Sequence, residues 1–173
     1  DDAGNFLLED FEKLLSPKTK LVAITHVSNV LGTIVPIKTI VQLARKVGAK
    51  VLIDGCQGIV HEGVDVQSLD ADFYAFTGHK LYGPSGIGVL WGKIDILNSM
   101  PPYEGGGDMI ETVTFEKSTF RDAPARFEAG TPPIIEAVGL ASAIDYVTDV
   151  GMDNIAIHEN NILKYATSCL SAI

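Results

Sequence analysis

The order strand, helix, strand between residues 21 and 54 most constrains the fold of this chain. Leu21–Thr25 and Val51–Asp54 are short, apolar and partly β-branched, which is typical of strands that are buried on both faces. Between them, Pro36 precedes Ile37–Val47, where apolar residues recur at helical spacing before Gly48. A right-handed crossover of this kind joins parallel strands, and ligands bind beyond their carboxyl ends. The sequence therefore predicts an α/β fold with a mostly parallel sheet flanked by helices.

Further elements are predicted on both sides of this unit. An apolar stretch from Asp72 predicts a strand ending at Lys80, and Gly88–Trp91 follows closely enough to pair with it in the antiparallel direction. The stretch that leads to Arg121 receives no assignment. Helices with an apolar face are predicted over Phe6–Leu15, Ile134–Val150 and from Asp153 onward, with Gly151 as the stop between the last two.

Composition argues against several classes of protein. The 173 residues are 46% hydrophobic and 20% charged, which suits one domain with a buried core. A formal net charge of -9 argues against nucleic acid as a partner, and no apolar run is long enough to span a membrane. Cys56 and Cys169 lie far apart and form no metal-binding spacing, so neither a disulfide framework nor a metal site is indicated. A cytoplasmic, reducing compartment fits this composition best.

Both ends of the sequence indicate a piece of a longer protein. The chain begins at Asp1 without an initiator methionine or a signal-peptide pattern. It stops at Ile173 inside a series of apolar residues at helical spacing, with no residue that would end a helix. We therefore expect further sequence beyond these residues.

Polar side chains follow three of the predicted strands. Because the carboxyl ends of parallel strands meet at one edge of the sheet, these side chains are expected to lie close together. They are Asn29 after the first strand, Asp54 and Gln57 after the second, and Thr77, His79 and Lys80 at the third. Lys80 stands between an apolar run and a Gly-rich turn, a position that suits a lysine aimed into a pocket.

Asp54 and Lys80 fit the requirements of a pyridine cofactor that carries an aldehyde. Such a cofactor needs a carboxylate beside its ring nitrogen and a lysine that binds its aldehyde as a Schiff base. Simpler interpretations exist: Lys80 could pack its stem with its ammonium in water, and Asp54 could cap a helix. Gln57 and Asn29 could be turn formers. Their combination at one sheet edge favours the cofactor hypothesis.

Four segments resemble the successive motifs of the class V, fold-type I pyridoxal-phosphate (PLP) enzymes. They are Ser28–Thr33, Asp54–Gln57, Thr77–Pro84 and Arg126–Pro132, and they stand in the family's order. The chain is most similar to the SufS-like, group II cysteine desulfurases, also called selenocysteine lyases. The resemblance implies that residues 1–150 are the C-terminal part of the PLP-binding large domain of a fold-type I transferase. Residues 151–173 would form a helix leading toward a small C-terminal domain.

The resemblance also implies roles for single residues around the ring of pyridoxal 5'-phosphate. Lys80 would hold the aldehyde and, once released by an amino acid, move protons at the substrate. Asp54 would pair with the pyridine nitrogen, and Gln57 would bind the ring hydroxyl oxygen. Asn29 would lie near that oxygen and the substrate carboxylate.

Three further residues are implied to bind the phosphate. Thr77 and His79 offer a hydroxyl and an imidazole as donors. Thr131 would reach the phosphate of a neighbouring subunit, which makes a homodimer part of the active site. An equally good interpretation of Thr131 is a hydroxyl that caps the helix beginning near Ile134.

In this family the reaction converts L-cysteine, or L-selenocysteine, to L-alanine. The sulfur passes to a nucleophilic cysteine, and then to a SufE-like or SufU-like acceptor for iron–sulfur cluster assembly. That cysteine, the substrate-binding arginine and the residue that stacks on the cofactor ring lie outside this sequence, so the chain alone is expected to be inactive. Cys56 and Cys169 are interpreted as small packed hydrophobes. Arg126 and Glu128 are expected to form an ion pair that supports the dimer loop.

Two alternatives share these motifs. An aminotransferase or another class V lyase would carry the same residues. A non-catalytic α/β binding or dimerisation module would keep the fold without the chemistry. The second is disfavoured, because a scaffold has no physical reason to assemble Lys80, Asp54, Gln57 and His79.

Overall fold

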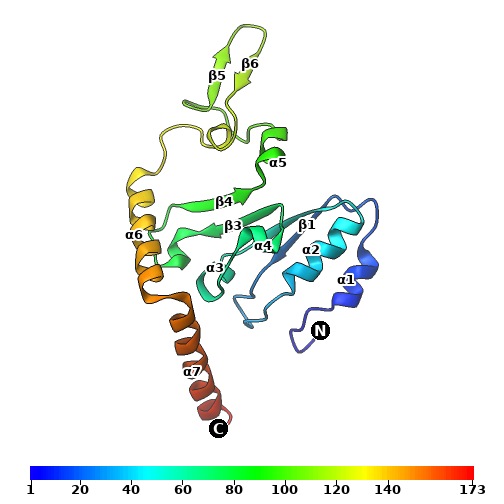
Figure 1. Cartoon of the computed structure of the whole chain (residues 1–173), viewed down its shortest axis with the longest axis vertical. Coiled ribbons are helices and arrows are strands. Elements are labelled where there is room, and N and C mark those ends of the chain that lie inside the picture. The colour runs from blue at the N-terminus through cyan, green and yellow to red at the C-terminus, as the bar shows by residue number, and fades with distance from the viewer.

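The sheet predicted from the crossover is present in the computed structural model, which describes residues 1–173 (Figure 1). Its strands lie in the order β1 (Leu21–Thr25), β2 (Lys50–Asp54), β3 (Phe73–Thr77) and β4 (Gly88–Gly92). The first three are parallel, and β4 is antiparallel to β3, as predicted from its close spacing. The α/β class and the mostly parallel sheet are therefore confirmed.

The register of the strands aligns their carboxyl ends. Thr25 pairs with Asp54, and Asp54 pairs with Ala75 on the next strand. Pairing continues just beyond the strands, because the backbone N–H of His26 donates to the carbonyl of Asp54 and that of Gly55 donates to the carbonyl of Ala75, both at 2.8 Å. The segments that leave β1 and β2 therefore start side by side, next to β3.

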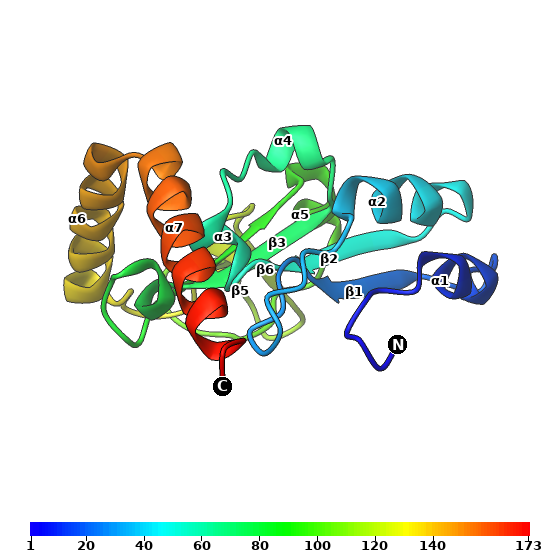
Figure 2. The same ribbon diagram turned by 90° about the horizontal axis from the view of Figure 1, so that it is seen from below.

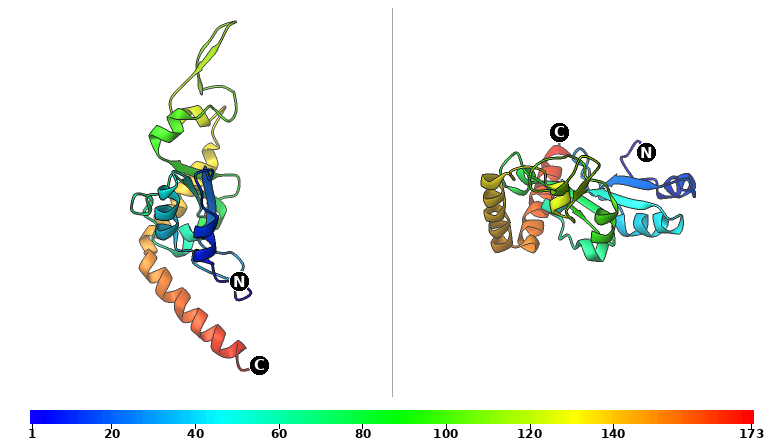
Figure 3. Two further views of the ribbon diagram at one scale, coloured as in Figure 1. Left: turned by 90° about the vertical axis from the view of Figure 1, so that its right-hand side faces the viewer. Right: turned by 90° about the horizontal axis from the view of Figure 1, so that it is seen from above.

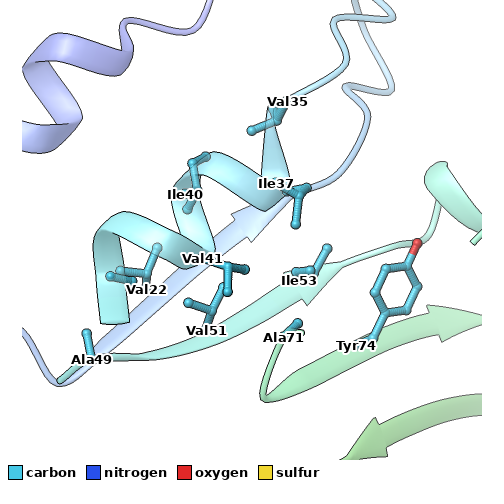
Figure 4. Packing of buried hydrophobic residues seen from close by; sticks show 11 residues of the cluster. Val22, Val35, Ile37, Ile40, Val41, Ala49, Val51, Ile53, Ala71 and Tyr74 are labelled. Carbon is cyan, nitrogen blue, oxygen red and sulfur yellow. The ribbon is translucent and has the colours of Figure 1, made fainter. Parts of the chain in front are cut away.

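The crossover helix α2 (Ile37–Lys46) covers one face of the sheet, as Figure 2 shows. Its apolar residues, among them Ile40 and Val41, face Val51 and Ile53 of β2 (Figure 4), and all four are at most 2% exposed. Burial of a side chain of this size contributes about 1.5–3 kcal/mol relative to leaving it in water. This packing forms the main core and fixes β2, together with the turn that follows it.

Two long helices follow the sheet, and they bury little surface within this chain. Helices α6 (Ile134–Val150) and α7 (Met152–Leu170) are separated by Gly151, as predicted. Helix α6 buries three residues, but large apolar side chains on its other faces, such as Ile135 and Val138, are exposed. The prediction of a single apolar face is therefore wrong for α6, which is apolar around most of its circumference, as is typical of a helix with neighbours on several sides.

The other helices are short. They are α1 (Leu8–Leu14), α3 (Gly58–His61), α4 (Val66–Leu69) and α5 (Ile94–Ser99), with 3-10 turns η1 (Gly78–Leu81) and η2 (Ala125–Phe127). Helix α1 is shorter than predicted at both ends, which is usual for helix boundaries taken from sequence. None of the helices combines the length and the apolar character needed to cross a membrane.

A two-stranded hairpin occupies the stretch that received no assignment. Strands β5 (Ile110–Val113) and β6 (Ser118–Phe120) pair in the antiparallel direction and project from the body at the end opposite to α7 (Figure 3). Most of their residues are exposed, and the side chains of Thr112 and Thr119 share a hydrogen bond of 2.6 Å across the pair. Without a buried face, the hairpin has no alternation of apolar and polar residues that sequence reasoning could detect.

Candidate functional site

The turn after β2 presents the carboxylate of Asp54. Asp54 is exposed at the end of the strand, and its Oδ1 accepts a hydrogen bond of 3.0 Å from the backbone N–H of Cys56. The next helix, α3, has Gln57 rather than Asp54 at its cap position, with no side-chain capping bond. The alternative that Asp54 caps a helix is therefore wrong.

Two glycines in this turn make room for aromatic rings beneath it. A Cβ on Gly55 would lie 2.0–2.3 Å from atoms of the Tyr74 ring, and one on Gly58 would lie 2.4 Å from Nδ1 of His26. Real Cβ atoms do not approach other atoms so closely. The absence of a side chain at these two positions thus allows the turn to rest directly on Tyr74 and His26.

His26 and Tyr74 were not among the predicted site residues, although they support the site. The Tyr74 hydroxyl lies 3.1 Å from Nδ1 of His26. Burial lowers the pKa of His26, and burial together with the charge of Asp54 raises the pKa of Tyr74, so both side chains are neutral near pH 7. The hydrogen bond between them therefore joins two uncharged side chains. The histidine directly after a buried strand was the only sequence signal for this pair.

Lys80 lies in a tight turn rather than at the end of a strand. Strand β3 ends at Thr77, and the 3-10 turn η1 follows, so the prediction of a strand through Lys80 is wrong. The backbone N–H of Gly78 donates to the carbonyl of Ile87 at 2.9 Å, which closes the segment onto itself. A Cβ on Gly78 would lie 2.8 Å from Cγ2 of Ile87, so this closure depends on glycine.

A small hydrophobic cluster holds the lysine turn against its neighbours. Leu81 is buried with Val60 of α3 and with Leu140 and Val147 of α6. Lys80, one position earlier, is half-buried. Packing of Leu81 therefore fixes the backbone from which the Lys80 side chain extends.

The surroundings of the Cys56 thiol bring the predicted residues together. Burial raises the pKa of this thiol, and so do the hydrogen bond and the charge of Asp54. A backbone hydrogen bond at Thr77 and the charge of Lys80 act in the opposite direction. Asp54, Thr77 and Lys80 thus all lie near one half-buried side chain at the carboxyl ends of β2 and β3.

Two predicted phosphate ligands also lie together. Oγ1 of Thr77 is 2.8 Å from Nδ1 of His79, at the point where β3 passes into η1. The Nε2 of His79 makes no hydrogen bond within the chain. A hydroxyl and an imidazole on one side of Lys80 form a donor set that suits a phosphate.

Gln57 connects the site turn to helix α7. Its Oε1 lies 3.3 Å from Nε2 of His61, the last residue of α3. The other ring nitrogen of His61 lies 2.9 Å from Oε1 of Glu159 on α7. The interpretation of Gln57 as a simple turn former does not account for these side-chain contacts.

Asn29 and Thr131 are not joined to this cluster by any hydrogen bond. Asn29 is exposed in the turn after β1. Thr131 is exposed ahead of α6, whose cap residue is Pro133 and which has no side-chain capping bond. The alternative that Thr131 caps this helix is therefore wrong.

Two other sequence expectations need correction. Arg126 forms its ion pair with Asp122 at 3.5 Å and donates to backbone carbonyls, whereas Glu128 makes no ion pair with it. Cys169 is exposed within this chain, so it is not a packed hydrophobe here. Arg126 and Cys169 each lie in a segment whose spatial neighbours cannot be predicted from the local sequence.

The α/β fold with its mostly parallel sheet is that of a class V aminotransferase domain, because the chain matches the aminotransferase class-V family over residues 1–173. The chain belongs to this family. It is 52% identical over 173 residues to the cysteine desulfurase of Synechococcus elongatus, a match that covers 100% of this chain and 28% of that protein. The chain thus spans less than a third of the length of this relative.

Solved structures agree with the sequence relatives. The apo cysteine desulfurase of Thermococcus onnurineus NA1 superposes with a TM-score of 0.93 at 40% identity, covering 99% of this chain and 43% of that one. A more distant structure is a mutant of C-DES with glycine covalently linked to its PLP cofactor. Its TM-score is 0.75 at 29% identity, over 85% of this chain and 40% of that one.

Proposed function

We propose that this chain is the central part of a PLP-dependent cysteine desulfurase of the SufS-like group. The observation that carries the proposal is that Asp54 ends β2 while Lys80 stands in the turn directly after β3, the strand that pairs with β2 in parallel. A lysine and a carboxylate in this relation are what a pyridine aldehyde requires. The relatives named cysteine desulfurase support the choice of reaction within the family.

The residues present fit pyridoxal 5'-phosphate. Lys80 would bind its aldehyde, and the exposed carboxylate of Asp54 would keep its ring nitrogen protonated. Gln57 would face its ring oxygen, with Asn29 nearby, while Thr77 and His79 would donate to its phosphate. Tyr74 and His26 support the turn that carries Asp54, which suits a carboxylate that must keep one position.

The bound cofactor would supply an electron sink for the substrate, and the residues of this chain would control the protons. Lys80 would accept a proton from the substrate Cα and return one to it, because it stands in a turn that holds its backbone fixed. Asp54 would hold its carboxylate in one position, because its Oδ1 accepts a hydrogen bond from the Cys56 N–H. These two roles need no movement of β2 or β3.

In the whole protein, sulfur would leave L-cysteine, or selenium L-selenocysteine, for a cysteine thiol outside these residues. The products would be L-alanine and a persulfide, which a SufE-like or SufU-like acceptor would take for iron–sulfur cluster assembly in the cytoplasm. Thr131 would reach the phosphate of a second subunit, so we infer a homodimer. Its exposure and lack of hydrogen bonds within this chain are consistent with that role. Residues 1–150 would belong to the large domain, and 151–173 would lead toward a small domain.

The test is the visible absorbance of the full-length protein loaded with PLP. Lys80→Ala is expected to abolish the band and the trapping of cofactor on the Lys80 peptide by borohydride. Lys46→Ala is the matched control, because Lys46 is exposed at the end of α2 and forms no ion pair. A band that persists unchanged in Lys80→Ala would contradict the assignment.

The reaction itself needs a second measurement. Full-length protein is expected to release alanine and sulfide from L-cysteine in the presence of a reducing thiol, whereas the 173-residue chain alone is expected to release neither. An aminotransferase would instead convert the amino acid to a keto acid. Keto acid as the main product would therefore select the alternative reaction and reject the desulfurase.

A further inference from the structure

A chain of three side chains runs from the site turn to helix α7. The Oε1 of Gln57 faces Nε2 of His61 at 3.3 Å. The Nδ1 of His61 lies 2.9 and 3.1 Å from the two carboxylate oxygens of Glu159, which comes 98 residues later in the sequence. Helix α3, which ends at His61, packs both against η1 and against α7. These contacts therefore connect α3, which packs against the turn that carries Lys80, to the distant helix α7.

The imidazole of His61 lies between two oxygen-bearing groups. Its Nδ1 faces the carboxylate of Glu159, and its Nε2 faces the oxygen of the Gln57 amide. A carboxylate and an amide oxygen can only accept hydrogen bonds. The ring therefore engages the oxygen end of the Gln57 amide on one side and is anchored by Glu159 on the other.

This arrangement leaves the NH2 group of Gln57 free. A primary amide has an acceptor end and a donor end, and a hydrogen bond to one end orients the other. With its oxygen facing His61, Gln57 has its two N–H donors at the other end of the amide.

We propose that His61 is a positioning residue that, anchored by Glu159, orients the Gln57 amide so that its NH2 group donates to the ring oxygen of the cofactor. This inference rests on the proposed function, because it takes the cofactor to be PLP. The ring oxygen of PLP carries negative charge and favours a donor over a second oxygen. His61 and Glu159 are 39% and 37% exposed, so their contact adds little to the stability of the fold. Its main effect would be to orient the Gln57 amide.

The first test removes the anchor without changing its shape. In full-length protein loaded with PLP, Glu159→Gln is expected to shift the visible absorbance maximum and to weaken PLP binding by roughly threefold to tenfold, the cost of one misoriented hydrogen bond. Glu62→Gln is the matched control, because Glu62 lines the same pocket of about 300 Å³ as His61 and Glu159 but makes no hydrogen bond with His61. The control is expected to keep both the maximum and the affinity.

The second test asks whether His61 acts through Gln57. PLP affinity and the absorbance maximum are measured for His61→Asn, Gln57→Ala and the double variant. If His61 orients Gln57, the effect of His61→Asn largely disappears in the Gln57→Ala background, whereas independent effects add. Circular dichroism and the melting temperature show that each variant is folded.

The outcomes separate this inference from the function on which it rests. Wild-type protein that binds no PLP would reject the proposed function and the inference with it. A wild-type band that is unchanged in Glu159→Gln, or additive losses in the double variant, would overturn the role of His61 while leaving the function intact. A shifted band together with non-additive losses supports it.

Discussion

The hydroxyl of Tyr74 on β3 forms a hydrogen bond of 3.1 Å with Nδ1 of His26, the residue that follows β1. The two rings meet edge to face, with centroids 6.0 Å apart and an interplanar angle of 90°. Both side chains are buried, and they meet beneath the turn at Gly55 that connects β2 to α3. This buried contact thus joins β3 to the end of β1 and supports the turn after β2 that carries Asp54.

Gly55→Ala tests this support. The added Cβ would overlap the Tyr74 ring, so the turn or the ring must move, at a cost of about 1–3 kcal/mol or more. We expect faster amide hydrogen exchange in residues 50–58 of the full-length protein and loss of PLP binding. Gly63→Ala is the control, because nothing lies within 4 Å of its added Cβ and its φ is not positive. Equal exchange rates in the two variants would show that the turn does not rest on Tyr74.

The lowered pKa of His26 leads us to expect that the stability of the protein depends on pH. Its pKa in the folded protein is lowered from 6.5, so the unfolded state binds the proton more readily. Stability is therefore full above pH 6.5 and declines as the pH falls toward the lowered pKa, by at most about 1.4 kcal/mol per pH unit for one proton. Burial is the main cause, and the charge of Glu62 opposes it.

The measurement for His26 is the difference in melting temperature between pH 7.5 and pH 5.5. We expect a smaller difference in His26→Gln than in the wild type, because the variant has no group that titrates at this position. His158→Gln, which removes an exposed histidine from α7, is expected to behave like the wild type. A pH dependence identical in all three proteins would contradict a buried, neutral His26.

Arg126 holds the segment before α6 through its hydrogen bonds to backbone carbonyls more than through its ion pair with Asp122. Its guanidinium donates to the backbone carbonyls of Asn98, Met100 and Arg121 at 2.6, 3.0 and 2.9 Å. Loss of such charged hydrogen bonds costs about 1.5–3 kcal/mol, so Arg126→Gln is expected to speed hydrogen exchange in residues 96–103 and 121–128. Asp122 is 82% exposed, so Asp122→Asn is expected to change stability by less than about 1 kcal/mol. If Asp122→Asn lowered stability more than Arg126→Gln did, the ion pair would be the main contact and this prediction would be wrong.

Local sequence patterns were sufficient where an element carries its own signal. Strand β1 has the predicted bounds, and α2 differs from its prediction by one residue at its end. In both, apolar spacing reflects burial against the sheet, so the pattern and the packing agree. The β5–β6 hairpin and the 3-10 turn at Lys80 lack such a pattern, because exposed or tightly turned backbone is held by hydrogen bonds that leave no periodic trace.

The sequence by itself predicted the mostly parallel sheet, the residues proposed for the site and their order along the chain. Only the tertiary structure decided what supports and orients them. Tyr74 is 48 residues from His26, and Glu159 is 98 residues from His61. Contacts at such separations depend on how the strands align and where α7 packs, because the pairing of distant side chains is set by three-dimensional packing and not by local propensity. The lysine and the carboxylate can therefore be found in the sequence, whereas the residues that hold the carboxylate turn and orient Gln57 appear only in the fold.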